Sequence, residues 1–166
     1  GRRIGPRTGK ISAFLTFDHV MSAYLRQVGF MVQTLVRAIN LKDQAYRELF
    51  PCPFVSATLT GCVEHARDMT AGGAQYNYGS ITARGFATAV DSLAAIQHFV
   101  FEKQTFSLVE ILHALDTNYR NAEPMRQRLI RQGPKFGCGH ETADAIAHTI
   151  FQFFCREVAA QRTITG

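Results

Sequence analysis

Apolar residues recur at three- and four-residue steps along the first part of the chain. They are Met21, Leu25, Val28, Val32, Leu35 and Ile39. Residues at these steps lie on one face of an α-helix, so the pattern predicts a long amphipathic helix. Asp18 is placed to cap its start, and Asn40 to end or bend it. A short helix that Pro53 can initiate follows, and we expect helices across residues 17–67.

The same spacing returns twice in the second half of the chain. One run comprises Phe86, Val90, Leu93, Ile96 and Val100, and the other comprises Ala143, Ile146, Ile150, Phe154 and Val158. Between these runs, Ser107 and Glu110 have the spacing of a capping box, in which each side chain bonds the other residue's backbone amide. Asn121 is placed to cap a further, shorter helix. Residues 86–166 are therefore predicted to be helical.

Residues 68–85 break the helical pattern. Gly72 and Gly73 permit positive φ or close backbone approach, and residues 75–78 alternate like a short strand. A single strand is not stable in water, and the chain hardly supplies a neighbour for it. With residues 1–16 as an arm or loop, the prediction is a mainly α fold with at least five helices and at most one or two short strands.

Composition places the chain among folded proteins. Its 166 residues are 46% hydrophobic and 19% charged, which is typical of a packed domain and excludes intrinsic disorder. No apolar run reaches the roughly 18 residues of a membrane span. Four cysteines without a disulfide framework, in a chain without a signal peptide, indicate reduced thiols and a cytoplasmic location.

The net charge of +5 comes mostly from the first ten residues. Arg2, Arg3, Arg7 and Lys10 lie there without an acidic residue, and in the rest of the chain basic residues exceed acidic ones by one. A nearly neutral body with a short basic arm is weak evidence for a polyanion partner. We therefore expect neither nucleic acid nor a membrane among the partners.

Side chains that can bind metals are present, but their spacing is unfavourable. Cys138, His140, His148 and Cys155 lie near one another in the sequence. The last two are about two helical turns apart, which is too far to share one ion easily. We therefore expect no metal site.

Nucleophilic catalysis and phosphate binding are equally poorly supported. Cys62 is followed closely by Glu64 and His65, but neighbours on a helix point in different directions, which favours a half-buried helical cysteine. Gly72 and Gly73 lack the lysine of a phosphate-binding loop. Asp91 lies inside a predicted helix and must be paired or face solvent. Spacing and periodicity assign no catalytic residue.

Several motifs, in order along the chain, resemble those of one enzyme family. They include Gly5-Pro6, Thr16-Phe17-Asp18, Pro53-Phe54-Val55-Ser56, Gly61-Cys62-Val63-Glu64, Gly72-Gly73-Ala74-Gln75-Tyr76-Asn77, Asp91-Ser92-Leu93-Ala94-Ala95-Ile96, Val100-Phe101-Glu102-Lys103 and Pro134-Lys135-Phe136-Gly137. Over essentially its whole length the chain resembles the glycyl radical enzymes of the pyruvate formate-lyase superfamily. The resemblance is strongest to the branch of glycerol dehydratase and choline trimethylamine-lyase.

This resemblance implies part of a ten-stranded α/β barrel and radical cleavage of a C–C, C–O or C–N bond. Lyases, dehydratases and formate acetyltransferases of anaerobic metabolism carry out such reactions on small molecules. The resemblance also implies a protein glycyl radical, which an iron–sulfur activase installs with S-adenosylmethionine, and no bound cofactor. It leaves open whether the protein is a homodimer.

The chain also departs from the family pattern. An Arg-Val-x-Gly-Tyr type run, which carries the radical glycine, does not occur in it. Cys62 precedes the Gly72-Gly73 run, which matches a later, non-catalytic helix, so the resemblance gives Cys62 no catalytic role. Cys138 and His140 stand where the family usually has asparagine and acids. We expect an internal segment, inactive alone, between the catalytic cysteine loop and the radical loop.

The resemblance also indicates a site. In the family, the strand after the Gly-Gly-Ala run lines the barrel interior, which makes Tyr76, Asn77 and Tyr78 candidate substrate-wall residues. Alternation places the two tyrosines on one face and Asn77 on the other. The alternative is that both rings pack as ordinary core. A free-standing helical binding or assembly module that retained the scaffold is the second functional hypothesis.

Overall fold

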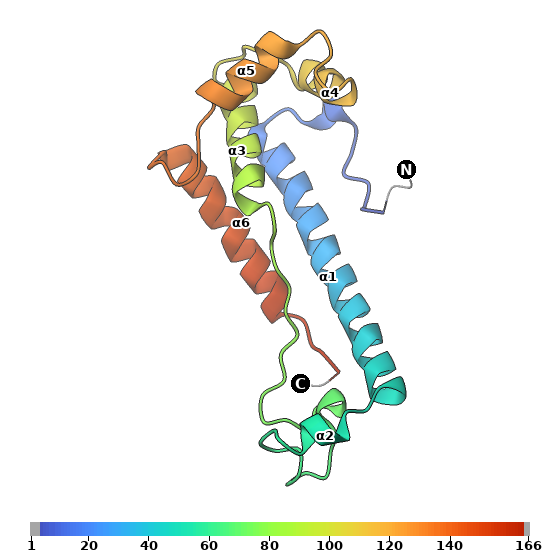
Figure 1. Ribbon diagram of the computed structural model, residues 1–166. Helices are drawn as coiled ribbons and strands as arrows, with labels where there is room; N and C mark the ends of the chain where they lie inside the picture. Colours follow the sequence, from blue (N-terminus) through green and yellow to red (C-terminus); the bar gives the residue numbers. More distant parts are fainter. Residues whose placement is uncertain (1–3, 165–166) are drawn as a thin grey trace. The chain divides into compact units, whose positions relative to one another are not determined.

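The computed structural model describes residues 4–164 as helices joined by turns and extended loops (Figure 1). Its α-helices are α1 (Phe17–Leu49), α2 (Pro53–Ser56), α3 (Phe86–Ile96), α4 (Leu108–Asp116), α5 (Glu123–Gln132) and α6 (Glu141–Ala159). The other elements are the 3-10 helices η1 (Ile11–Ala13) and η2 (Met69–Ala71) and the π-helix η3 (Gln97–Glu102). The predicted mainly α fold with at least five helices is confirmed, and no strand occurs within residues 4–164.

The chain divides into two compact units. The first unit comprises residues 1–28 and 83–154, and the second comprises residues 29–82 and 155–166. Helices α1 and α6 each contribute residues to both. Within the basic arm, Arg2 and Arg3 lie outside the described residues. Within residues 4–164, no helix has the length and apolar character needed to cross a membrane.

The core of the first unit forms among α3, the first part of α1 and most of α6 (Figure 1). Its buried members are Met21, Val90, Leu93, Ala94, Ala143, Ile146, Ala147 and Ile150. Removing such side chains from water contributes about 25 cal/mol per Å² of apolar surface. The alanines leave room for the neighbouring helices to approach closely. The apolar faces predicted for α3 and α6 are thus confirmed.

The Gln27 side chain of α1 holds the arm that precedes this helix. Nε2 of Gln27 donates a hydrogen bond to the carbonyl oxygen of Pro6 at 2.8 Å. A Cβ atom on Gly5 would overlap the end of the Gln27 side chain, so a larger residue at that position would displace this flexible side chain.

The two ends of α1 differ from the prediction. The helix starts at Phe17, so Asp18 lies in its first turn, where a negative charge favours the helix N-terminus, rather than at the cap. It also continues past Asn40 to Leu49, because the intervening residues are mostly good helix formers. The Asn40 side chain instead bonds the segment after α6, accepting from the Ile164 amide at 3.1 Å.

Of the other two caps predicted from the sequence, one is confirmed. At the start of α4, Ser107 Oγ accepts from the Glu110 amide at 3.2 Å, and Glu110 Oε2 accepts from the Ser107 amide at 2.7 Å. The cap predicted at Asn121 is wrong, because α5 begins after Ala122, which makes no side-chain cap bond. Asn121 has φ of 65°, within a left-handed turn that delays the helix.

The predicted helix from Phe86 to Val100 changes type part of the way along. After Ile96 the backbone continues as the π-helix η3, whose final bond runs from the Lys103 amide to the His98 carbonyl at 2.8 Å. Donor and acceptor are five residues apart, which is the π pattern. Apolar spacing cannot distinguish this wider turn from an α-helical one.

The strand suggested by alternation at residues 75–78 is not formed. Residues 76–83 have neither helical nor strand structure. Within the described part of the chain no partner strand is available, and an isolated strand has nothing to receive its hydrogen bonds.

A compact loop follows α2 in the second unit. The amide of Gln75 donates to the Thr60 carbonyl at 2.8 Å and closes the loop. Gly61 has φ of 97°, and a Cβ atom there would lie 2.8 Å from the Gly73 carbonyl oxygen. A Cβ atom on Gly73 would overlap the Arg67 carbonyl oxygen. These two glycines let three backbone segments pack directly on one another.

The core of the first unit gives a matched pair of stability predictions. Ile146 on α6 is buried, with 4% of its surface exposed, whereas Ile130 on α5 is about half exposed. Ile146→Ala should lower the free energy of unfolding by about 2–5 kcal/mol through a cavity. Ile130→Ala should change it by less than about 0.5 kcal/mol. Urea unfolding followed by circular dichroism measures both, and equal losses would contradict the assigned core.

The loop glycines give a second pair. Gly73→Ala forces Cβ into the Arg67 carbonyl, whereas Gly137→Ala faces open space and meets only the strain of φ near 81°. The Gly137 change should cost about 1–2 kcal/mol of unfolding free energy, and the Gly73 change more. Thermal unfolding of both variants tests this. A Gly73 variant as stable as the Gly137 variant would show that the backbone segments are not in direct contact.

Candidate functional site

The Gly-rich segment that holds the candidate residues begins at Asp68. Oδ1 of this carboxylate accepts from the Thr70 amide at 2.8 Å and from its hydroxyl at 2.7 Å. Oδ2 accepts from the Cys52 amide at 2.9 Å and from the Ser56 hydroxyl at 2.8 Å. Ser56 Oγ in turn accepts from the Met69 amide at 2.9 Å. One carboxylate therefore joins the start of α2 to the start of η2.

These bonds also set the charge state of the carboxylate. Hydrogen bonds from the Thr70 hydroxyl and amide, with those from Ser56 and Cys52, lower the pKa of the Asp68 carboxyl below its ordinary value, against an opposing effect of desolvation. Because the folded pKa is the lower one, the network contributes stability above the ordinary aspartate pKa. That stability is lost as the pH falls through the folded value.

Asn77 turns back onto the Gly-rich turn. Its Nδ2 donates to the Ala74 carbonyl at 2.7 Å and to the Gly72 carbonyl at 3.4 Å. The side chain is only partly exposed, unlike those of its neighbours Tyr76 and Tyr78. Its amide nitrogen therefore holds the turn, and its Oδ1 is the atom that can face a ligand.

Tyr76 and Tyr78 present a pair of parallel rings. Their centroids are 6.4 Å apart, with 1° between the ring planes, so both lie on the same side of the extended segment, as the alternation predicts. They are 69% and 86% exposed, so neither ring belongs to the core of this chain. Two phenol hydroxyls and two aromatic faces are thus available for contact with a ligand or another protein segment.

The alternative chemistry around Cys62 finds no support in the geometry. The cysteine is buried, with 3% of its surface exposed, rather than half-buried on a helix. Glu64 Oε2 accepts from the Gly61 amide at 2.8 Å, and His65 Nδ1 lies 3.4 Å from the Gly73 carbonyl oxygen. The carboxylate and the imidazole nitrogen that could activate the thiol are thus engaged with backbone atoms.

The sequence offered the Gly72-Gly73 pair as a possible phosphate site and Cys138 with His140 as part of a possible metal site. The amides of Gly72 and Gly73 donate to the carbonyls of Met69 and Asp68, so they do not form a cradle for an anion. Within residues 4–164, no three side chains of His, Cys, Asp or Glu are grouped as metal ligands would be. Cys138 and His140 are exposed in the turn before α6.

Asp91 on α3 is paired, as its position inside a helix requires. Its Oδ1 accepts from the Phe136 amide at 2.9 Å, and its Oδ2 lies 3.7 Å from Lys135 Nζ. The carboxylate thus fastens the turn after α5 to α3, and its role is structural.

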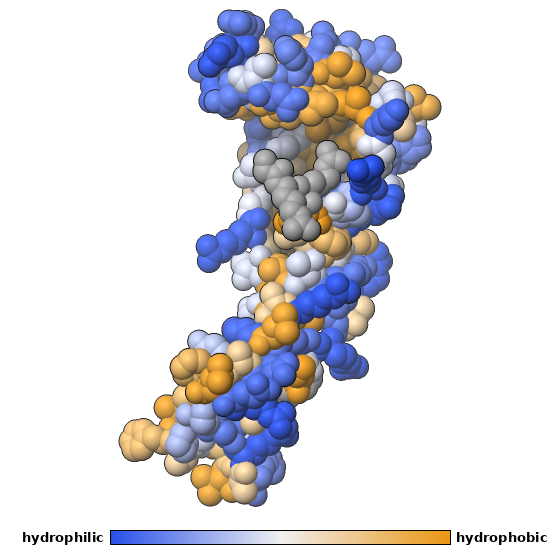
Figure 2. All heavy atoms as spheres, turned by 90° about the vertical axis from the view of Figure 1, so that its right-hand side faces the viewer, coloured by the Kyte–Doolittle hydropathy of each residue, from blue (hydrophilic) through white to orange (hydrophobic). Residues whose placement is uncertain are grey.

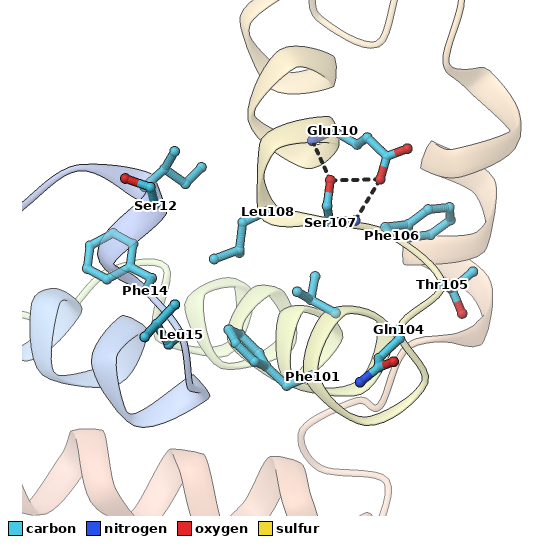
Figure 3. Close-up of a pocket in the computed structure, with 12 residues that line it drawn as sticks. Ser12, Phe14, Leu15, Phe101, Gln104, Thr105, Phe106, Ser107, Leu108 and Glu110 are labelled. Atoms are coloured by element: carbon cyan, nitrogen blue, oxygen red, sulfur yellow. Dashed lines mark hydrogen bonds between the residues drawn. The ribbon is translucent and has the colours of Figure 1, made fainter.

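Sequence reasoning missed an open groove of about 600 Å³ in the first unit (Figure 3). Its walls come from the segment around η1, from η3 and from the start of α4, including Leu15, Phe101 and Leu108. The segment around η1 is distant in the sequence from η3 and α4, so no local motif predicts the groove. Its polar lining includes Ser107 and Glu110, which bond each other in the capping box.

Hydrophobic residues also reach the surface elsewhere. Figure 2 shows them in several places on the face that it draws. The most exposed large hydrophobic side chains are Phe54, Tyr78 and Leu15, at 86%, 86% and 77%. Single exposed apolar residues are ordinary, but so many on a short chain favour contacts with further protein.

Comparison with known proteins places these features in one family. A family model described as pyruvate formate lyase-like matches residues 1–166. Among curated proteins, the chain is 32% identical over its full length to a (2S)-3-sulfopropanediol dehydratase of Klebsiella oxytoca. It is 30% identical over 99% of its length to a trans-4-hydroxy-L-proline dehydratase of Clostridioides difficile.

Solved structures agree. A B12-independent glycerol dehydratase from Clostridium butyricum, with glycerol bound, matches 99% of the chain with a TM-score of 0.91 and 31% identity. A glycyl radical enzyme from Archaeoglobus fulgidus matches 90% with a TM-score of 0.82 and 30% identity. The chain covers 21% and 19% of these two structures, and about a fifth of the curated relatives. The match along all 166 residues shows that the chain belongs to the pyruvate formate lyase-like family of glycyl radical enzymes.

Proposed function

We propose that this chain forms one part of a glycyl radical lyase or dehydratase that acts on a small hydroxylated substrate. The observation that carries the proposal is the likeness, at a TM-score of 0.91 over 99% of the chain, to a glycerol dehydratase with glycerol bound. The curated relatives include dehydratases and an isethionate sulfite-lyase from Desulfovibrio desulfuricans.

The substrate class follows from what these relatives are named for. Sulfopropanediol, hydroxyproline, glycerol and isethionate are all small, polar and hydroxylated. Dehydration of a diol removes a hydrogen and a hydroxyl group from neighbouring carbons as water and leaves a carbonyl compound. The net reaction is redox-neutral, so it consumes no external oxidant or reductant.

Tyr76, Asn77 and Tyr78 are proposed to form part of that wall. The tyrosine hydroxyls can donate to or accept from substrate hydroxyls, and Oδ1 of Asn77 can accept from one. The two tyrosine rings exclude water from one side of the site. All three lie on a segment anchored at Gln75 and at the Gly-rich turn, which fixes where their side chains start.

The radical chemistry is proposed to lie outside these residues. The glycyl radical, installed by an iron–sulfur activase that uses S-adenosylmethionine, would generate a thiyl radical on a catalytic cysteine outside these residues. That sulfur would take a hydrogen atom from a substrate C–H bond and return it to the product radical. Residues 68–78 then contribute binding and orientation only.

Anaerobic activation of the full-length protein tests the proposed class. Incubation with a cognate activase should give the electron paramagnetic resonance signal of a glycyl radical. The activated protein should turn over at least one of glycerol, propane-1,2-diol, trans-4-hydroxy-L-proline, (2S)-3-sulfopropanediol and isethionate. A full radical signal with no turnover of any of these compounds would contradict the substrate class.

The tyrosines give a sharper test of the wall. Tyr76→Phe and Tyr78→Phe each remove one hydroxyl and should lower kcat/KM about two- to tenfold, mainly through KM. The effect is modest because each lost hydrogen bond joins two uncharged groups. Tyr46→Phe, on α1 and half exposed beside Phe50, is the matched control and should leave kcat/KM unchanged. If the site variants behave like the control, neither hydroxyl contacts the substrate.

A further inference from the structure

The Asp68 carboxylate is saturated with hydrogen bonds. Each of its oxygens accepts from two donors at 2.7–2.9 Å, and these donors belong to Thr70, Cys52 and Ser56. A carboxylate offers about four acceptor sites, so no acceptor capacity is left for a ligand. Its contribution is therefore made through the residues that it joins, and not by direct contact with a substrate.

The same residue also fixes the Gly-rich turn through its backbone. The carbonyl oxygen of Asp68 accepts from the Ala71 amide at 3.0 Å and from the Gly73 amide at 2.9 Å. Gly72 between them has φ of 82°, the left-handed conformation that glycine adopts without strain. The side chain and the carbonyl of one residue thus define the path of the chain up to Gly73.

From Gly73 the constraint continues to the tyrosines. The Gln75 amide is held by the Thr60 carbonyl, and the Asn77 side chain is held by the Ala74 and Gly72 carbonyls. Tyr76 lies between these two anchored residues, and Tyr78 follows directly. An extended segment without a partner strand has no other regular hydrogen bonding to fix its direction.

We infer that Asp68 is a positioning residue, which holds the Gly-rich turn in the one path that directs Tyr76 and Tyr78 to their places. This role rests on the proposed function for its effect on substrate, but not for its effect on the loop. A neutral amide cannot replace the carboxylate, because asparagine has one acceptor oxygen and its NH2 group meets donors. Asp68→Asn therefore loses about half of these hydrogen bonds and leaves the NH2 group of the asparagine without an acceptor.

Hydrogen exchange with mass spectrometry on the full-length protein tests the loop directly. Asp68→Asn should speed exchange about tenfold in the peptide that covers residues 69–78, because bonds to a charged acceptor are among the stronger ones. The peptide that covers α3 should be unchanged. Asp43→Asn is the matched control: it removes the same charge in the second unit, where Asp43 pairs with Lys42 at 2.9 Å, and should leave both peptides unchanged.

A milder variant keeps the test valid if Asp68→Asn unfolds. Thr70→Val removes only the hydroxyl that donates to Asp68 Oδ1. It retains the hydrogen bond from the Thr70 backbone amide and nearly the same side-chain volume. It should accelerate exchange in the same peptide by a smaller factor. If residues 69–78 exchange at the wild-type rate in both variants, the positioning role is overturned, whatever the kinetics.

Steady-state kinetics with glycerol and trans-4-hydroxy-L-proline as probes then separate the two ideas. Faster exchange with a raised KM, an unchanged kcat and a full radical signal supports the positioning role. Faster exchange with an unchanged KM, while Tyr76→Phe or Tyr78→Phe raises KM, overturns it. If neither Asp68→Asn nor the tyrosine variants move KM, the proposed substrate wall fails, and the exchange result still supports Asp68 as the residue that holds the loop.

Discussion

The carboxylate of Asp68 accepts hydrogen bonds from both ends of α2, at Cys52 and Ser56, and from Thr70 within the loop that follows α2, and the order of that loop depends on it. The loop has no regular secondary structure apart from one short 3-10 turn. Its backbone polar groups must therefore find partners one by one, since a buried donor or acceptor without a partner is costly. The Asp68 carboxylate satisfies four donors at once. Gly61 and Gly73, which have no side chain, allow the backbone segments of the loop to approach closely.

Much of the helical framework was predictable from spacing alone. The buried positions Val90, Leu93 and Ile146 lie on the apolar faces that the three- and four-residue steps indicate, and the capping box at Ser107 is a short-range signal that forms as expected. Asn121 failed as a cap because the left-handed turn before α5 is set by several residues together. The π-helical geometry of η3 could not be predicted, because apolar spacing does not distinguish a π-helical turn from an α-helical one.

The candidate site was less predictable from residue spacing than the helices were. Tyr76, Asn77 and Tyr78 were proposed as site residues through a family resemblance, and alternation correctly predicted that the two rings share one side. The strand itself did not form, because its partners are not among the described residues. The role of Asp68 was visible only in part: an Asp two residues before a Thr is a local turn signal, but the bonds to Cys52 and Ser56 join segments that no local pattern connects.

The π-helical turn of η3 has a consequence for how this part of the fold can change. A π turn closes its ring with one more residue than an α turn, so it is equivalent to an α-helix into which a single residue has been inserted. Side chains beyond the insertion are rotated by about 100° relative to a continuous α-helix. Phe101, in the wall of the groove, lies within this π turn, and the groove residues Gln104 and Thr105 follow it. Insertions and deletions of one residue here are thus a means of redirecting the groove's lining without altering the core of α3.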